Sequence, residues 1–231
     1  MKKICFTVDM EPDCPPYLDT FRGIEEGTGP LLDLLDAEHI KATFFTTGLV
    51  ARRYPEVVET IVARGHELGC HGNSHQVFTH MDEMTARTEI QQSSRTLRRF
   101  APVSAFRAPN LKFPDNYLEL LERTGYRVDS SQAKYKLDYY RKTRPTSLKR
   151  VAVSVTSSVL RLPPVILFPI LACLTDPVVL FVHPWEFVDL RGEPLRLDCR
   201  FRTGAAALSC LRSVLRFFKQ KECCFYRIKD L

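Results

Sequence analysis

Seven short apolar segments, rich in β-branched and aromatic residues, recur along the chain, and each has the length of a buried strand. They cover residues 4–8, 42–46, 67–70, 103–106, 126–129, 178–183 and 224–228. Between several of them, apolar residues recur every three or four positions, which is the pattern of a helix with one buried face. The predicted helices cover residues 29–39, 49–65, 84–100, 115–125 and 205–221. The second and fourth end at a glycine, a residue that commonly follows a helix.

The alternation of predicted strands and helices indicates an α/β fold. Short connections from strand to helix to strand force the strands to run parallel, either in a barrel or in an open doubly wound sheet. About seven strands favour the barrel, and 231 residues is a usual length for one such domain. We therefore expect one domain over residues 1–231.

Titratable or cationic residues stand at the carboxyl ends of five predicted strands. They are Asp9, His71, Arg107, Asp129 and His183. One polar residue in such a place is usually a cap or a loop anchor, but catalytic groups of parallel barrels collect at this end of the strands. Five such residues therefore indicate one shared site.

The sequence GCHGNSH places His71 and His75 four residues apart. Histidines at this spacing can bind one metal ion, although alone they more often mark a loop. A catalytic zinc site takes three protein ligands and leaves one position open, so a carboxylate must come from elsewhere. Asp9 and Glu11 point to the same side of an extended segment, so that one could bind the ion and the other accept a proton. His183, with an ordinary histidine pKa of about 6.5, suits proton donation.

Composition adds little to this interpretation. A net charge of +6, with 45% hydrophobic and 26% charged residues, is ordinary for a globular protein and gives little support to nucleic-acid binding. Residues 1–9 lack the apolar core of a signal peptide, so we expect a cytoplasmic protein. The eight cysteines form no CxxC pair, and we expect them to be reduced and not to bind zinc.

The motifs TVDME, KATFF, GHELGCHGNSH, FRAP, GYRVDSS and FVHPWEF occur in this order over residues 4 to about 190. In this order and at these intervals the chain resembles the NodB-homology polysaccharide deacetylases, carbohydrate esterase family four. The resemblance implies a distorted (β/α)7-type barrel and a divalent metal, commonly zinc, with cobalt, manganese or nickel as alternatives. It also implies hydrolysis of the N-acyl group, first of all N-acetyl, of an amino sugar in a polysaccharide or glycan precursor.

The same resemblance assigns catalytic roles residue by residue. Asp9 would be the general base, and Arg107 would keep it ionised. His183 would be the general acid, and Asp129 would orient it through a hydrogen bond. Asp129 is followed by Ser130 where the family often has tryptophan, which departs from the pattern at this position.

The metal ligands implied by the resemblance are His71 and His75, with a carboxylate as the third. Where the family usually has two adjacent aspartates, one residue separates Asp9 from Glu11 in this chain. We therefore expect Glu11 to be the third ligand, with Asp13 as the alternative.

Two further motifs bear on the substrate. Trp185 follows His183 in HPWE, which resembles a branch encoded with exopolysaccharide export systems; it either stacks on a sugar or fills the barrel rim. The segment from Asp19 to Gly27 is similar to the DTxRGxxEG segment of lipid-linked formamido-arabinose deformylases, which act at the cytoplasmic membrane face. In it, Arg22 either binds substrate or anchors the loop.

Residues 132–177 form the part least like the family, and we expect a variable insert there. Its first half is KYKLDYYRKTR, and its second half, LPPVILFPILACLT, is uncharged but too short and too rich in proline to span a membrane. The segment is either a solvated loop beside core, or a surface for a phosphate-bearing polyprenyl sugar and for peripheral membrane association. A barrel that binds glycans without catalysis is the remaining alternative.

Overall fold

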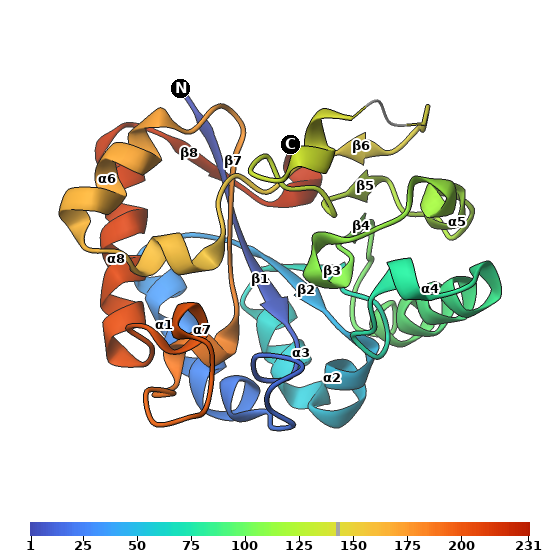
Figure 1. Ribbon diagram of the computed structural model, residues 1–231, viewed down its shortest axis with the longest axis horizontal. Coiled ribbons are helices and arrows are strands. Elements are labelled where there is room, and N and C mark those ends of the chain that lie inside the picture. The colour runs from blue at the N-terminus through green and yellow to red at the C-terminus, as the bar shows by residue number, and fades with distance from the viewer. Residues whose placement is uncertain (142–143) are drawn as a thin grey trace.

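The computed structural model describes residues 1–141 and 144–231, and its centre is one curled sheet (Figure 1). Every strand pairing among the described residues is parallel, in the order β6-β5-β4-β3-β2-β1-β7, with β8 beside the start of β1. The strands are β1 (Lys3–Met10), β2 (Thr43–Thr46), β3 (Glu67–Cys70), β4 (Ala105–Phe106), β5 (Val128–Asp129), β6 (Lys149–Arg150), β7 (Val178–Val182) and β8 (Cys224–Tyr226). The predicted parallel α/β barrel is confirmed, in the form of a half-barrel.

The edges of the sheet, β6 and β7, are joined by the chain between them. Val153 forms a parallel bridge with Ala133, and the backbone N–H of Ser154 donates to the carbonyl of Val179 on β7 at 2.8 Å. Part of the segment predicted as an insert therefore fills the gap in the barrel wall.

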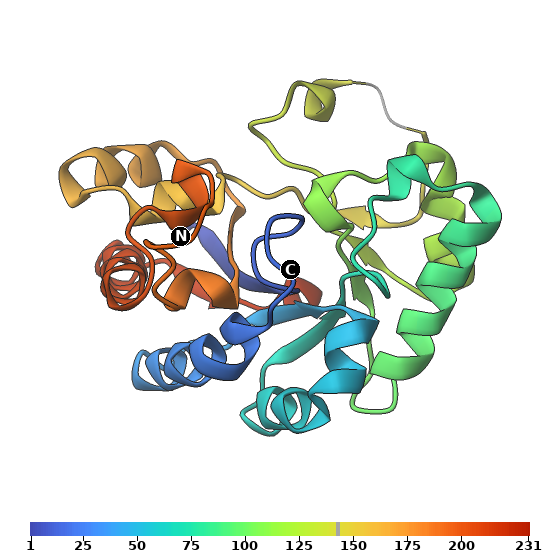
Figure 2. The ribbon, with the colours of Figure 1, turned by 60° about the horizontal axis from the view of Figure 1, so that its bottom comes forward.

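Helices form the outer layer, and in Figure 2 the dark blue loop after β1 lies in the middle of their ring. The helices are α1 (Thr28–Ala37), α2 (Gly48–Arg53), α3 (Pro55–Ala63), α4 (Glu83–Leu97), α5 (Leu118–Arg123), α6 (Pro164–Cys173), α7 (Leu197–Arg200) and α8 (Ala205–Gln220). Shorter helical turns are η1 (Gly23–Gly27), η2 (Phe78–His80), η3 (Pro109–Leu111), η4 (Asp115–Tyr117), η5 (Leu137–Tyr140), η6 (Ser157–Arg161), η7 (Pro184–Phe187) and η8 (Ile228–Asp230).

The predicted helix over residues 49–65 is two helices in the structure. Pro55 has no backbone N–H to continue α2, and Tyr54 before it has φ −132° and ψ 59°, outside the helical region. Pro55 then starts α3, a position that suits proline. The break turns the chain so that α3 can bury Val58 and Ile61.

The core explains the continuous apolar runs in the strand sequences. β1 is buried from Ile4 to Met10, because α1 and α8 cover its outer side and the barrel interior fills the other. Within the described residues, no helix combines the length and the apolar character needed to cross a membrane.

The uncharged run within residues 132–177 forms α6, which has both a buried and an exposed face. Leu167 and Leu171 are buried, and Phe168 stacks on Phe217 of α8 at 5.0 Å. Val165 and Ile166 are exposed by 80% and 50%. The helix therefore contributes one face to the core and leaves the other as an exposed apolar surface.

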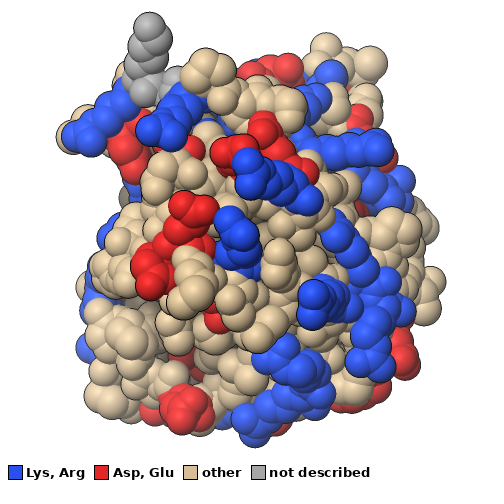
Figure 3. All heavy atoms as spheres, turned by 90° about the vertical axis from the view of Figure 1, so that its right-hand side faces the viewer, with Lys and Arg blue, Asp and Glu red and all other residues tan. Residues whose placement is uncertain are grey.

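Basic side chains outnumber acidic ones on the face that carries α4 and α5, as Figure 3 shows. Arg98, Arg99 and Arg127 line a shallow hollow at the amino ends of β4 and β5. Because the predicted site residues stand at the carboxyl ends of the strands, this basic hollow lies at the other end of the barrel.

Candidate metal and catalytic site

The carboxyl ends of the strands bring the predicted residues to one edge of the sheet. Asp9 lies near the end of β1, His71 directly follows β3, Arg107 directly follows β4, Asp129 ends β5 and His183 directly follows β7. Asp9, Glu11, His71, His183 and Trp185 all line one pocket of about 390 Å³. Of the five strand-end residues, Asp9, His71 and His183 line this pocket, whereas Arg107 and Asp129 are not among its lining residues.

Glu11, His71 and His75 form a group that could hold a metal ion, with ligand atoms all within 4.8 Å of one another. Nε2 of His75 and Nε2 of His71 lie 2.6 Å and 3.3 Å from Oε2 of Glu11. Burial raises the pKa of Glu11, but the charges of His75 and His183 outweigh it and hold that pKa well below its usual range.

The orientation of the histidine rings fits a cation between these atoms. Nδ1 of His71 lies 2.8 Å from the carbonyl oxygen of Arg107 and must donate to it, because a carbonyl only accepts. In a neutral His71 ring with its proton on Nδ1, the lone pair of Nε2 faces a carboxylate oxygen of Glu11. These two electron-rich atoms repel each other unless a cation lies between them. Nε2 of His75 is buried and has no hydrogen bond with acceptable geometry. The donor set suits zinc, which takes histidine nitrogen and carboxylate oxygen ligands.

The loop that carries the two histidines is held by a residue that the sequence did not indicate. Glu89 of α4 accepts hydrogen bonds from the backbone N–H groups of Asn73 and Ser74 at 2.9 and 3.0 Å, and from the Ser74 hydroxyl at 2.8 Å. His75 itself has φ +63°, a left-handed conformation that costs about 1–2 kcal/mol outside glycine. Such strain is expected where the surrounding contacts fix a functional loop.

Asp13, the alternative candidate for the carboxylate ligand, makes hydrogen bonds within the loop after β1 instead. It accepts hydrogen bonds from the Thr20 hydroxyl at 2.7 Å and from the backbone N–H groups of Arg22 and Gly23 at 2.7 and 2.8 Å. These contacts close the loop after β1. The structure therefore places Glu11, and not Asp13, beside the histidines.

Asp9 is paired with Arg107 at the base of the pocket. Nη1 of Arg107 lies 2.6 Å from Oδ1 of Asp9, and both side chains are buried. Arg107 also donates to the hydroxyls of Thr7 and Ser130 at 2.8 and 2.9 Å, and lies 4.2 Å from the ring centroid of Phe45. The predicted contact between Arg107 and Asp9 is confirmed.

His183 lies near the other carboxylate oxygen of Glu11, Oε1, whereas the two ligand histidines lie near Oε2. Its Nε2 lies 3.6 Å from Oε1 of Glu11, and its ring stacks on Trp185 at 4.7 Å between centroids. Nδ1 lies 2.9 Å from Oε1 of Glu186. Burial lowers the pKa of His183, but the Glu11 charge and the hydrogen bond to Glu186 raise it to about 9.

The predicted hydrogen bond from Asp129 to His183 is wrong. The Asp129 carboxylate instead lies 2.7 Å from Nε of Arg150 and accepts from the Ser131 hydroxyl. The physical reason is the strand order, because β5 and β7 lie on opposite sides of β1 with three further strands between β1 and β5. Burial raises the pKa of Asp129. Any catalytic role of Asp129 stays a prediction.

Arg22 lies in the loop after β1, and its contacts are those of a loop anchor. Its Nε pairs with Glu26 at 3.1 Å, its Nη1 lies 3.6 Å from Glu193, and its backbone N–H donates to Asp13. Its predicted substrate-binding role is untested, and its side chain is not among the described residues that line the pocket.

Trp185 is buried and lines the pocket, and its indole nitrogen lies 3.4 Å from Oε1 of Glu11. Stacking on a sugar therefore stays a prediction, while stacking on His183 is observed.

Two glycines of the segment that resembles DTxRGxxEG allow η1 to pack against η7. A Cβ on Gly23 would lie 2.3 Å from the backbone nitrogen of Trp185, and one on Gly27 would lie 2.2 Å from the carbonyl oxygen of Pro184. The segment therefore supports the turn that follows His183.

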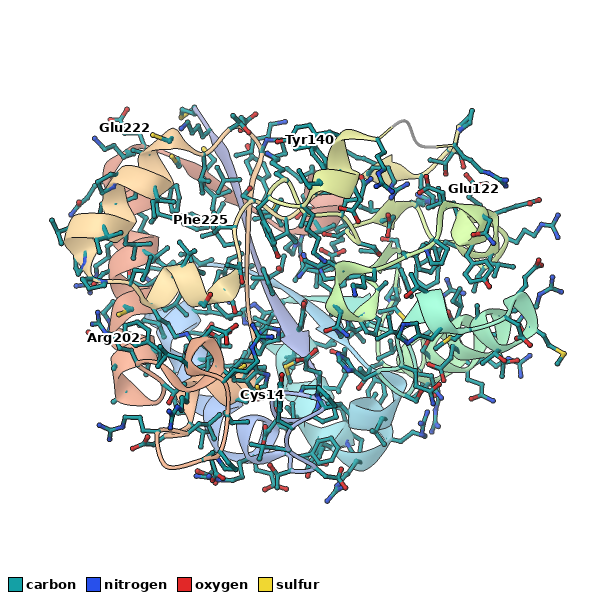
Figure 4. All side chains as sticks on the ribbon, in the orientation of Figure 1. Cys14, Glu122, Tyr140, Arg202, Glu222 and Phe225 are labelled. Carbon is teal, nitrogen blue, oxygen red and sulfur yellow. The ribbon has the colours of Figure 1, made fainter. Side chains whose placement is uncertain are left out.

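The pocket is also lined by Cys14, labelled in Figure 4 near the carboxyl end of β1, and by Cys199 of α7. Each of the eight cysteines, all within the described residues, is free.

The half-barrel thus carries, at the carboxyl ends of its strands, a carboxylate and two histidines that could hold a metal ion, together with an arginine-paired aspartate. The sequence profile of the polysaccharide deacetylase family matches residues 1–128. The chain therefore belongs to the polysaccharide deacetylase family.

Curated relatives match a part of the chain. The peptidoglycan-N-acetylglucosamine deacetylase of Bacillus cereus is 36% identical over 76 residues, which is 33% of this chain and 28% of that protein. A chitooligosaccharide deacetylase of Bradyrhizobium is 31% identical over 75 residues, 32% of this chain and 34% of that protein. The matched part spans less than half the length of these relatives.

Solved structures share the fold over almost the whole chain. The Bc1960 peptidoglycan N-acetylglucosamine deacetylase aligns with a TM-score of 0.66 and 19% identity, covering 99% of this chain and 86% of that chain. A structure described as a CE4 family pseudoenzyme from Bacillus anthracis aligns with a TM-score of 0.67 and 16% identity, covering 100% of this chain and 65% of that chain.

Proposed function

We propose that the protein is a metal-dependent hydrolase that removes an N-acyl group from an amino sugar of a polysaccharide or glycan precursor. N-acetyl is the first candidate for the acyl group. The observation that carries this proposal is the buried group of Glu11, His71 and His75 beside the aspartate Asp9 and the histidine His183. A metal site alone suits many proteins. A carboxylate and a histidine that line the same pocket can supply the proton acceptor and the proton donor that amide hydrolysis needs.

Glu11, His71 and His75 would hold a divalent ion, with zinc as the first candidate, and the ion would act as a Lewis acid that polarises a carbonyl and lowers the pKa of water. Asp9 accepts the proton of the attacking water, and the Arg107 guanidinium beside it keeps the carboxylate charged and fixed. Nε2 of His183 faces the pocket and donates a proton to the departing amine. Bond cleavage then leaves a free amino sugar and the acid of the acyl group.

A lipid-linked amino sugar is the second candidate substrate, because an apolar groove continues from the catalytic pocket. Ser158 and Asp198 line both the pocket and a groove of about 480 Å³. The other residues that line the groove are Val159, Leu162, Leu197 and Phe201. A hydrocarbon chain attached to the sugar could lie along this groove, and the exposed face of α6 could rest on the cytoplasmic surface of a membrane.

The test is release of acetate or formate by zinc-loaded protein from free, polymeric and polyprenyl-linked N-acyl amino sugars. Asp9→Asn should abolish turnover and leave zinc stoichiometry unchanged, because Asp9 accepts a proton and does not bind the ion. Asp33→Asn, at an exposed aspartate of α1, is the matched control and should keep full activity.

The outcomes separate the candidates. Acetate from glycans supports the first substrate class, and release only from lipid-linked sugars supports the second. Loss of zinc in Asp9→Asn would show that Asp9 is a ligand. A wild-type protein that binds zinc and glycans but releases neither product would contradict the proposed hydrolase and favour a glycan-binding barrel.

A further inference from the structure

We propose that Glu186 and Arg161 are positioning residues that hold His183 in the orientation needed to donate a proton. The proposal rests on the proposed function of His183. It gives to Glu186, three residues after His183, the orienting role that the family resemblance implied for Asp129.

Glu186 binds His183 at two atoms. Its Oε1 lies 2.9 Å from Nδ1 of the ring and accepts the backbone N–H of His183 at 3.0 Å. An imidazole can rotate by half a turn about its Cβ–Cγ bond, which exchanges the positions of Nδ1 and Cδ2 and those of Nε2 and Cε1. A hydrogen bond to Nδ1 fixes the ring and therefore the direction in which Nε2 points. With Nδ1 on Glu186, Nε2 faces Glu11 and the pocket.

Arg161 in turn holds Glu186. Its Nε lies 2.9 Å from Oε2 of Glu186, and the two side chains are exposed by only 3% and 2%. A carboxylate buried to this extent needs a charged partner or several donors. Arg161 therefore makes it possible for Glu186 to be charged so far from water.

The same guanidinium also binds the backbone of the segment that forms one wall of the pocket. Its Nη atoms donate to the carbonyl oxygens of Asp198 at 2.6 Å, Cys199 at 3.1 Å and Phe201 at 2.6 Å. These carbonyls belong to α7 and the residue after it, and Asp198 and Cys199 line the pocket. Arg161 thus joins the orientation of His183 to the position of this wall.

The site therefore has two buried pairs of arginine and carboxylate. Arg107 holds Asp9 at the carboxyl end of β1, and Arg161 holds Glu186 after β7. The first pair contains the proposed proton acceptor, Asp9, itself. The second pair contacts the proposed proton donor, His183, through Glu186. Since the two arginines lie on different segments, each side of the pocket is fixed independently.

The test compares Glu186→Gln, which keeps the side-chain volume, with the double variant Arg161→Leu and Glu186→Leu, which removes both buried charges together. The first readout is the ¹H–¹⁵N resonance of the His183 Nδ1 proton at one fixed pH, which needs no activity. We expect a protected resonance in the wild type and its loss in the double variant. Asp129→Asn is the control and should leave the resonance unchanged.

The second readout is kinetic, on any substrate that the wild type hydrolyses. We expect kcat to fall by about 10²-fold or more in both Glu186 variants, with KM and zinc stoichiometry unchanged, because a general acid contributes in this range. An unchanged resonance in the double variant, or a change seen only in Asp129→Asn, would overturn the proposal. An inactive wild type with the expected resonances would refute the proposed function and leave the positioning contact intact.

Discussion

Arg107 is the largest of the fully buried side chains, and its position shows how much a single residue contributes to the site. It binds Asp9, two hydroxyls and the face of an aromatic ring at once. Removing one partner of a buried ion pair leaves the other charge without compensation, at a cost of about 3–5 kcal/mol.

We therefore expect Arg107→Met to lower the free energy of unfolding by about that amount in urea denaturation. The double variant of Arg107→Met and Asp9→Asn should lose less than the sum of the single variants, because the two charges are removed together. Arg87→Met, which breaks an exposed pair with Glu83 on α4, is the matched control and should cost less than about 1 kcal/mol. Equal losses for the two arginines would show that Arg107 stabilises the fold only by packing.

At the level of residues, the sequence indicated the members of the site that stand directly at strand ends or in a spaced motif. Glu11 and the two histidines come together because Glu11 follows β1 and the histidines follow β3, two parallel strands that lie on either side of β2. Glu186 and Arg161 could not be paired from the sequence, since Arg161 precedes α6 in a segment without a recognisable period. Glu89 was hidden in the same way, as one of several polar residues on α4.

At the level of elements, the packing of η1 on η7 depends on Gly23, whose missing Cβ leaves room for the backbone of Trp185. We expect Gly23→Ala to push η7 away, to lower stability by about 1–3 kcal/mol and to reduce turnover, because overpacking shifts the backbone. Gly192→Ala is the control: Gly192 is exposed and nothing lies within 4 Å of a Cβ placed there, so the substitution should change stability by less than about 0.5 kcal/mol. Thermal unfolding and the deacylation assay measure both effects, and a harmless Gly23→Ala would contradict the proposed role of this contact.

The elements that sequence patterns predicted are those with a clear period. Seven strands and the amphipathic helices were found because one face of each helix is buried and each strand is apolar. The helix α6 was missed because it is apolar all round, so no period separates its buried Leu167 from its exposed Val165. The strand β6 is only Lys149 and Arg150, which carry no apolar signal.

At the level of the whole molecule, a metal ion would join the loop after β1 to the loop after β3, two segments some sixty residues apart in the sequence. We expect one equivalent of zinc to raise the melting temperature and a chelator to reverse the rise, because a ligand that binds only the folded state stabilises it by about 2.7 kcal/mol at 100 times its Kd. His75→Gln should lose most of this shift, whereas His80→Gln, at an exposed histidine, should keep it. An equal zinc shift in His75→Gln would exclude His75 as a ligand.

The close contact between η1 and η7 also has an evolutionary consequence. Residues 23–27 and 184–187 are more than 150 positions apart, yet a larger side chain in the first would displace the turn that carries Glu186 in the second. Homologues should therefore keep or lose the two motifs together, because residues in contact co-vary. A chimera could take residues 23–27 from this chain and the turn after β7 from a relative that lacks the first motif. Its two segments would not pack on each other, although each packs well in its parent protein.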